Sequence, residues 1–309
     1  MQDQEEVLSL RGDYMADGKT VKIIVAAHKA FRMPQDEMYL PLHVGAEGKK
    51  DQNGQPLDIG FVRDNTGDNI SLKNPGYCEL TGLYWAWKNL DADYIGLAHY
   101  RRHFSLHRTR DPFDGVLKYS ELVPLLRRKR VIVPKKRRYY IESLYNHYKH
   151  THYISQLDET RRIIEEKYPD YLPSFDRVVR RTWGHMFNMM IMERGLVDEY
   201  CRWLFDILFE LEKRVKAGMV EMPPLSSFQA RFYGRISEII FNVWLDDCLR
   251  TGKLSKKDIY EIPCRFMEKE NWFRKVWGFL KAKFFGVRYE VLDASHALPE
   301  PMNDGEKIN

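Results

Sequence analysis

Histidine and arginine residues cluster in one short stretch of the chain, directly after an apolar segment. Residues 94–98 (YIGLA) predict a buried strand, and His99, Arg101, Arg102 and His103 follow it. Side chains alternate along a strand, so a strand continuing through the cluster would present His99 and Arg101 on one face. Open α/β sheets bind ligands at the carboxyl ends of their strands, and guanidinium forks match phosphate oxygens. The cluster therefore predicts an anion site, which a diphosphate would fit best.

A second signal for an anion comes from the segment that precedes this strand. Residues 63–74 (RDNTGDNISLKN) are rich in turn-forming side chains, and Asn74 followed by Pro75 predicts the start of a helix. The free N–H groups and positive dipole end of a helix start favour a negative ligand. A well-capped surface turn is the alternative interpretation. The residues expected to contact the ligand or to shape its loop are Asp68, Asn69, Ser71, Lys73 and Asn74.

Apolar patterns elsewhere predict the elements that position these groups. Residues 21–27 (VKIIVAA) form a nearly continuous apolar run, which is typical of a strand covered on both faces. Residues 75–87 carry apolar side chains at three- and four-residue steps, which indicates a helix with one buried face. Residues 183–192 (WGHMFNMMIM) predict another buried strand, in which His185 and Asn188 are polar exceptions.

The overall composition is that of a soluble globular protein. The chain has 309 residues, 44% of them hydrophobic and 30% charged, with a net charge of +5. This charge is too small to indicate a nucleic-acid partner, and no reader motif accompanies it. The four cysteines lack metal spacing and predict reduced thiols. Residues 1–19 lack the apolar core of a signal peptide, and no run is long enough to span a membrane. We therefore expect a cytoplasmic protein.

Two long sequence motifs resemble a known family. The runs NISLKNPGYCELTGLYWAWKN and DYIGLAHYRRHF, together with the weaker WGHMFNMMIM and RISEIIFNVWL, make the chain similar to the DUF4422 family over most of residues 20–250. Its members are bacterial proteins of capsular and exopolysaccharide synthesis that are regarded as glycosyltransferases. The resemblance implies an α/β fold: a GT-A-like single Rossmann-type domain with a mixed central sheet, a helical insertion and a C-terminal amphipathic helix. It also implies a nucleotide-sugar donor.

The resemblance suggests roles for particular residues. His99, Arg101 and Arg102 would stabilise the leaving diphosphate as its charge develops. Glu238 matches an acidic position of the family and is a candidate catalytic base, although an ion pair with a neighbouring arginine is the favoured explanation; Glu79 is the other carboxylate of interest. In GT-A enzymes the first strand leads into the nucleotide pocket and a late strand borders the acceptor. The matching donor-side residues are Ala26, Ala27 and His28, and the acceptor-side residues are His185 and Asn188.

The need for a metal stays open at this point. Many GT-A enzymes bind a divalent ion through an Asp-x-Asp at the end of a strand, but Asp91 and Asp93 precede the strand here and are expected to be turn residues. His99, Tyr100 and Arg101 stand where that motif would fall, so cationic side chains would do some or all of the charge neutralisation. Manganese or magnesium held by other ligands is the alternative, because His28 and His99 could meet at neighbouring strand ends.

The chain divides into four expected parts. Residues 1–19 form a flexible arm, 20–265 the GT-A-like catalytic domain, 266–290 a basic amphipathic helix and 291–309 a disordered tail. Within the third part, residues 271–285 (NWFRKVWGFLKAKFF) combine aromatic and basic side chains, which suits a membrane interface. Packing of this helix against the catalytic domain is an equal alternative.

The predicted function is that of a hexosyltransferase. The chain would move a hexosyl unit from a nucleotide-diphosphate sugar, UDP-linked and of galactose type, to a lipid-linked surface glycan, and would lie peripherally on the inner membrane face. The alternatives are a non-catalytic, membrane-associated assembly factor of polysaccharide synthesis, and a nucleotide-sugar hydrolase or nucleotidyltransferase that uses the same anion site.

Overall fold

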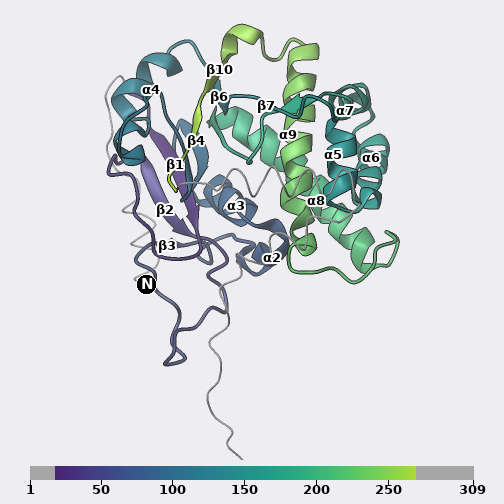
Figure 1. Cartoon of the computed structure of the whole chain (residues 1–309), viewed down its shortest axis with the longest axis horizontal. Coiled ribbons are helices and arrows are strands. Elements are labelled where there is room, and N and C mark those ends of the chain that lie inside the picture. The colour runs from purple at the N-terminus through teal and green to yellow at the C-terminus, as the bar shows by residue number, and fades with distance from the viewer. Residues whose placement is uncertain (1–17, 269–309) are drawn as a thin grey trace, which may run out of the picture.

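A mixed β-sheet forms the centre of the molecule. The computed structural model describes residues 18–268 (Figure 1). In that part of the chain the main sheet has the order β10-β6-β9-β4-β1-β2-β3, with β5 beside β4 and β11 beside β5. Its strands are β1 (Val21–Ala27), β2 (Tyr39–His43), β3 (Val62–Arg63), β4 (Tyr94–His99), β5 (Arg102–Phe104), β6 (Val131–Pro134), β9 (Met190–Glu193), β10 (Ile259–Ile262) and β11 (Cys264–Phe266).

The first strand, β1, is buried on both of its faces, as its apolar sequence predicts. β1 pairs in parallel with both β2 and β4, so its backbone polar groups are satisfied on both sides. Ile24 and Ala26 pack into the core on one face of the sheet, and Ile23 and Val25 into the core on the other. The apolar run of residues 21–27 is thus confirmed as a doubly covered strand.

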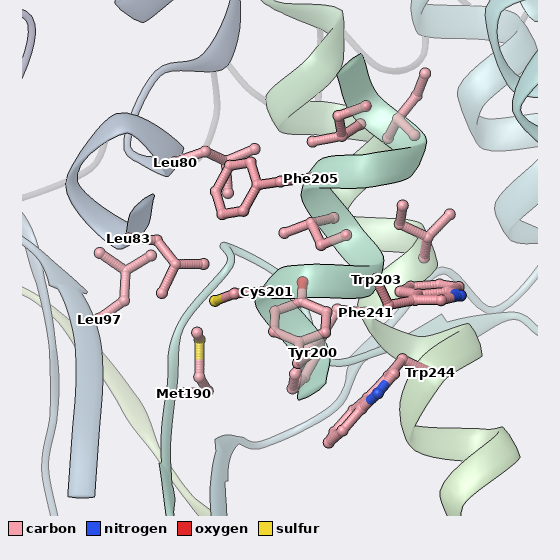
Figure 2. Packing of buried hydrophobic residues seen from close by; sticks show 14 of the residues in the cluster. Leu80, Leu83, Leu97, Met190, Tyr200, Cys201, Trp203, Phe205, Phe241 and Trp244 are labelled. Atoms are coloured by element: carbon pink, nitrogen blue, oxygen red, sulfur yellow. The ribbon is translucent and has the colours of Figure 1, made fainter. Parts of the chain in front are cut away.

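Helices cover both faces of the sheet. The helices are α2 (Asn74–Tyr77), α3 (Leu80–Asn89), α4 (Tyr119–Leu126), α5 (Leu144–Thr151), α6 (Ile154–Lys167), α7 (Leu172–Val179), α8 (Arg194–Lys216) and α9 (Phe232–Arg250). Side chains of α4 share a core with β1 on one face, whereas α3, α8 and α9 cover the other. Figure 2 shows this second core, where Leu83 and Leu97 approach Met190, Cys201 and Phe205.

A helical insertion separates the two strands of a small second sheet. β7 (Arg137–Arg138) pairs antiparallel with β8 (Trp183–Gly184). Between them the chain forms α5, α6 and α7, which lie on the α9 side of the molecule (Figure 1). The α/β class, the mixed sheet and the helical insertion therefore agree with the expectation from sequence.

Three predicted elements have different bounds. The helix expected from Pro75 onward is interrupted at Cys78, so α2 is short and α3 starts afresh. The strand expected over residues 183–192 is two strands, β8 and β9, because the chain between them turns. β4 ends at His99, which pairs with Arg102 across a tight turn. The expectation that His99 and Arg101 share a strand face is therefore wrong.

Several expected parts lie outside the described residues. These are the N-terminal arm, the basic helix and the tail, except for residues 18–19 and 266–268. β11 extends past the expected domain end at residue 265. Among residues 18–268, none of the helices combines the length and the apolar character needed to cross a bilayer.

Candidate active site

A small cavity lies at the carboxyl end of β4. Its volume is about 70 Å³, and four separate segments contribute to it: the α2–α3 junction, the β4–β5 hairpin, the loop before β9 and the first turns of α9. Its lining brings together four of the residues selected from sequence, namely Glu79, His99, Arg102 and Glu238. The other lining residues are Cys78, Phe187, Arg231, Gly234 and Arg235.

His99 lines the cavity with a fixed ring orientation. Its Nε2 lies 2.6 Å from the carbonyl oxygen of Phe187. A carbonyl only accepts hydrogen bonds, so this contact assigns the proton to Nε2 and leaves Nδ1 as an acceptor. Burial and the Arg102 guanidinium lower the pKa of His99, against the opposing effect of Glu79. The imidazole is therefore neutral near pH 7.

Glu79 is an ionised carboxylate next to this imidazole. Asn188 Nδ2 donates to Glu79 Oε1 at 2.7 Å and also to the Gly234 carbonyl at 3.0 Å. Burial raises the pKa of Glu79, but the Asn188 amide, a backbone N–H and the Arg235 guanidinium stabilise its charged form, and the pKa lies below its ordinary value. A charged acceptor is thus kept in a water-poor site.

Three guanidinium groups surround the two carboxylates. Arg235 Nη1 donates to Glu238 Oε1 at 3.1 Å, and Arg231 Nε lies 3.1 Å from the sulfur of Cys78. Arg102 stacks over the Phe187 ring at 4.6 Å. Burial raises the pKa of the Cys78 thiol despite this arginine, so the group stays protonated. With three permanent cations against two carboxylates, the cavity favours an anionic ligand.

Unusual backbone conformations shape the cavity walls. Among residues 18–268, four non-glycine residues have positive φ, and Cys78 (53°), Phe187 (75°) and Asn188 (53°) are three of them. Such conformations cost about 1–3 kcal/mol each and tend to mark functional sites. At Cys78 the turn breaks the helix and leaves Glu79 at the start of α3. At Phe187 and Asn188 it directs a carbonyl to His99 and an amide to Glu79.

The predicted residues of the 63–74 loop lie elsewhere and have structural partners. Lys73 binds Glu212 at 2.7 Å, and α2 has only four residues, so the helix start that motivated this prediction is short. Ser71 Oγ donates to the buried Asp64. The side chains of Asp68 and Asn69 hold their own loop, through contacts with Tyr84 and with the backbone. Asn74 Nδ2 donates to the Cys78 carbonyl at 2.8 Å and so supports the helix break.

The remaining predicted residues fall into two groups. Ala26 is in register with His99 on the neighbouring strand, and Ala27 and His28 follow at the same edge; His28 packs edge-on against Tyr100. Arg101, in contrast, does not line the cavity, because it lies in the turn after β4 and pairs with Glu268 at 3.1 Å.

Two further histidines do not line the cavity. His185 is buried between β6 and α9. Its ring Nδ1 contacts the Pro134 carbonyl, and its backbone N–H donates to Asn242 Oδ1. His103 was expected to add positive charge. Burial instead lowers its pKa to about 3, so His103 is neutral and the expectation is wrong.

The prediction from sequence missed Arg231 and Arg235 as site residues and considered them only as partners of Glu238. Their signal was present: residues four apart on a helix share one face, and Glu238 follows Arg235 by three. Phe187 and Cys78 carried no comparable signal, because positive φ at a non-glycine residue cannot be read from residue type.

The cavity does not have the donor set that a divalent metal needs. Glu79 is held by an amide and Glu238 by a guanidinium, and the cations Arg102 and Arg231 line the same cavity. Residues 18–268 contain no cluster of three or more His, Cys, Asp or Glu placed to hold a metal. Asp93 accepts from the Thr20 backbone and hydroxyl before β4, as expected of a turn residue.

A solved structure and a family model both match this chain. The solved apo structure of the bifunctional glycosyltransferase WbbM matches with a TM-score of 0.71 and 29% identity, over 81% of this chain and 46% of WbbM. The chain thus spans about half the length of that protein, and its fold is GT-A-like. The family model described as "Domain of unknown function (DUF4422)" matches residues 22–249, and the chain belongs to this family. A search of curated proteins finds no match.

Proposed function

We propose that the chain is a glycosyltransferase that uses a nucleotide-diphosphate sugar. The observation that carries the proposal is the cavity at the carboxyl end of β4, where three guanidinium groups, a neutral imidazole and two carboxylates meet. The similarity to WbbM, a bifunctional glycosyltransferase, supports the same class of reaction. The match covers less than half of WbbM, so it supports the class of reaction and not a particular donor or acceptor.

The arginines are suited to the leaving group. When a glycosyl bond to a diphosphate breaks, negative charge develops on the departing phosphate oxygens. Arg102, Arg231 and Arg235 are permanently charged and donate in planar forks, so they would bind and stabilise that charge. Preorganised charges of this kind are worth more in a water-poor cavity than in bulk water.

Glu79 is the proposed base that accepts the proton of the acceptor hydroxyl. It is ionised, borders the cavity and is oriented by the Asn188 amide. Glu238 is bound by Arg235 at 3.1 Å, and its proposed role is to position that guanidinium. His99 lies beside Glu79 as a neutral ring whose Nδ1 can accept a hydrogen bond from a substrate hydroxyl.

The proposal extends to a particular donor and acceptor. The donor would be a UDP-hexose of galactose type, and the acceptor a lipid-linked surface glycan on the cytoplasmic membrane face. Ala26, Ala27 and His28 would contribute to the nucleotide side, because they end β1 next to His99. These assignments rest on the family and on the position of the cavity.

The decisive experiment is a donor panel with purified protein. We expect release of nucleoside diphosphate from one UDP-sugar, accelerated by a glycan acceptor. Glu79→Gln should abolish transfer while UDP still raises the melting temperature by mass action. Combined Arg231→Ala and Arg235→Ala substitutions should remove that thermal shift. Release of monophosphate or pyrophosphate, or diphosphate release that no acceptor accelerates, would contradict the proposal.

A further inference from the structure

Two large hydrophobic side chains project into solvent directly after β7. Tyr140 is 80% exposed and Ile141 is 68% exposed, whereas most large apolar side chains of the described residues are buried. We call residues 135–141 the β7 tip. A contiguous exposed pair of this kind carries an unfavourable hydration cost, and such features mark interaction sites.

The backbone of the β7 tip holds Tyr140 outward. Its φ is 57°, a left-handed conformation that bulky residues rarely adopt. The N–H of Ile141 donates to the Tyr139 carbonyl at 2.6 Å and closes a tight turn around Tyr140. Glycine would fit this turn without strain. The choice of an exposed tyrosine in a strained position indicates that its side chain has a function there.

Basic residues directly precede the exposed pair in the chain. Lys135, Arg137 and Arg138 are exposed, and within residues 18–268 none of the three forms an ion pair with a carboxylate. Lys136 binds Glu261 at 2.8 Å. Its ammonium also lies 4.6 Å from the ring of Trp183, on the paired strand β8. The tip thus combines exposed apolar side chains with exposed cations. This combination fits a surface that has anionic groups at its boundary and an apolar interior.

The β7 tip is joined to the cavity. The Arg137 guanidinium lies 5.2 Å from the Tyr139 ring and 5.8 Å from the ring of Phe187, which lines the cavity. Tyr139 also lies within electrostatic reach of Glu238 and Arg235. A surface bound by the tip would therefore lie close to the cavity.

We propose that the β7 tip docks on the anionic headgroups of a lipid bilayer. Tyr140 and Ile141 would enter the interface, where a tyrosine keeps its ring among apolar groups and its hydroxyl in water. Lys135, Arg137 and Arg138 would bind the headgroup phosphates. The docking requires no sugar donor, so it can be tested separately from the transferase activity. Its consequence is that a lipid-linked acceptor would be presented beside the cavity.

The test is co-sedimentation of the full chain with vesicles. One set contains phosphatidylcholine alone, and the other contains equal parts of phosphatidylcholine and phosphatidylglycerol. The apolar variant combines Tyr140→Gly with Ile141→Ser, and the charge variant combines Lys135→Glu with Arg138→Glu. Because glycine relieves the strain at position 140, the apolar variant should fold at least as well as the wild type, and its melting temperature checks this. The matched control is Leu72→Ser, since Leu72 is 75% exposed and lies away from the tip.

We expect the wild type and the Leu72→Ser control to sediment with the anionic vesicles only. Both tip variants should bind at least about tenfold more weakly. Diphosphate release with a water-soluble acceptor should be unchanged in the tip variants, which separates docking from catalysis. Wild-type binding that the tip variants retain would overturn the proposal, as would absence of wild-type binding to anionic vesicles.

Discussion

The imidazole of His99 is held by the backbone of Phe187, a residue 88 positions later in the chain, at 2.6 Å from Nε2 to the carbonyl oxygen. The next residue, Asn188, holds Glu79 through its amide. One strained dipeptide thus orients both members of the imidazole–carboxylate pair. Because the pKa of each member depends on the other, the loop before β9 controls the protonation of the cavity.

Asn188→Gly should shift the pH dependence of transfer. Glycine accepts the positive φ of this position, so the backbone is preserved. Glu79 loses the amide that stabilises its charged form, so its pKa should rise. As the pH is lowered, the variant should therefore lose the activity that needs ionised Glu79 at a higher pH than the wild type does. The pH dependence of kcat/KM measures this shift. Phe187→Gly keeps the carbonyl and is the control, and an unshifted acid limb in Asn188→Gly would refute the role of the amide.

Arg102→Ala and Arg101→Ala should differ strongly. Arg102 lines the cavity, whereas Arg101 lies in the turn and pairs with Glu268. Loss of a preorganised charge at a developing anion costs about 10²–10³ in rate, so Arg102→Ala should reduce kcat by that factor. Arg101→Ala should reduce it only a few-fold. Steady-state kinetics of UDP release compares the two variants, and equal losses would place the diphosphate nearer to the turn.

Asp64→Ala should destabilise the fold without touching the cavity. This buried carboxylate accepts from the backbone N–H groups of Gly45 and Ala46 and from the hydroxyls of Ser71 and Thr81. Removing it leaves several buried donors unpaired, which should cost about 3 kcal/mol in the free energy of unfolding. Urea denaturation measures the loss. Asp68→Ala, at an exposed position in the same region, is the control and should change stability little.

Folding stability should fall as the pH drops below 6.5. Burial lowers the pKa of His152 to about 4, against an ordinary value of 6.5. A group with a lowered folded-state pKa contributes its full stability above the unfolded pKa and loses that contribution as the pH falls through the folded value. For His152 this is up to about 3 kcal/mol between pH 6.5 and 4. His152→Asn keeps a donor for Gln229 and should flatten the urea-midpoint profile in this window; an unaltered slope would assign the acid sensitivity to other groups.

The sequence was informative where a pattern repeats along the chain. The apolar run of residues 21–27 has one structural solution, a strand covered on both faces, and α8 follows its apolar spacing to Lys216. The position of the cavity also followed from one observation, that His99 and Arg102 come at the end of a buried strand.

The detail of the site depended on contacts that no local pattern encodes. The Pro75 helix looked continuous because its apolar spacing continues through Cys78, yet Cys78 turns to positive φ beside Arg231. In the same way, the Met-rich run gave no sign that Phe187 and Asn188 break it. Both departures depend on tertiary partners far away in sequence, and they place Glu79 and the His99 contact at the cavity.

β9 is the one strand of the β10-to-β3 order that runs against its neighbours, since it pairs antiparallel with both β4 and β6. Residues that enter β9 therefore arrive at the edge where residues leave β4. The proposed catalytic pair is completed only when β9 has joined β4 and β6 into one sheet, and β9 follows β4 by about ninety residues in the chain. A nascent chain that ends before Asn188 would contain His99 and Glu79 without the Phe187 carbonyl and the Asn188 amide that orient them. The protein would therefore gain its activity late in synthesis.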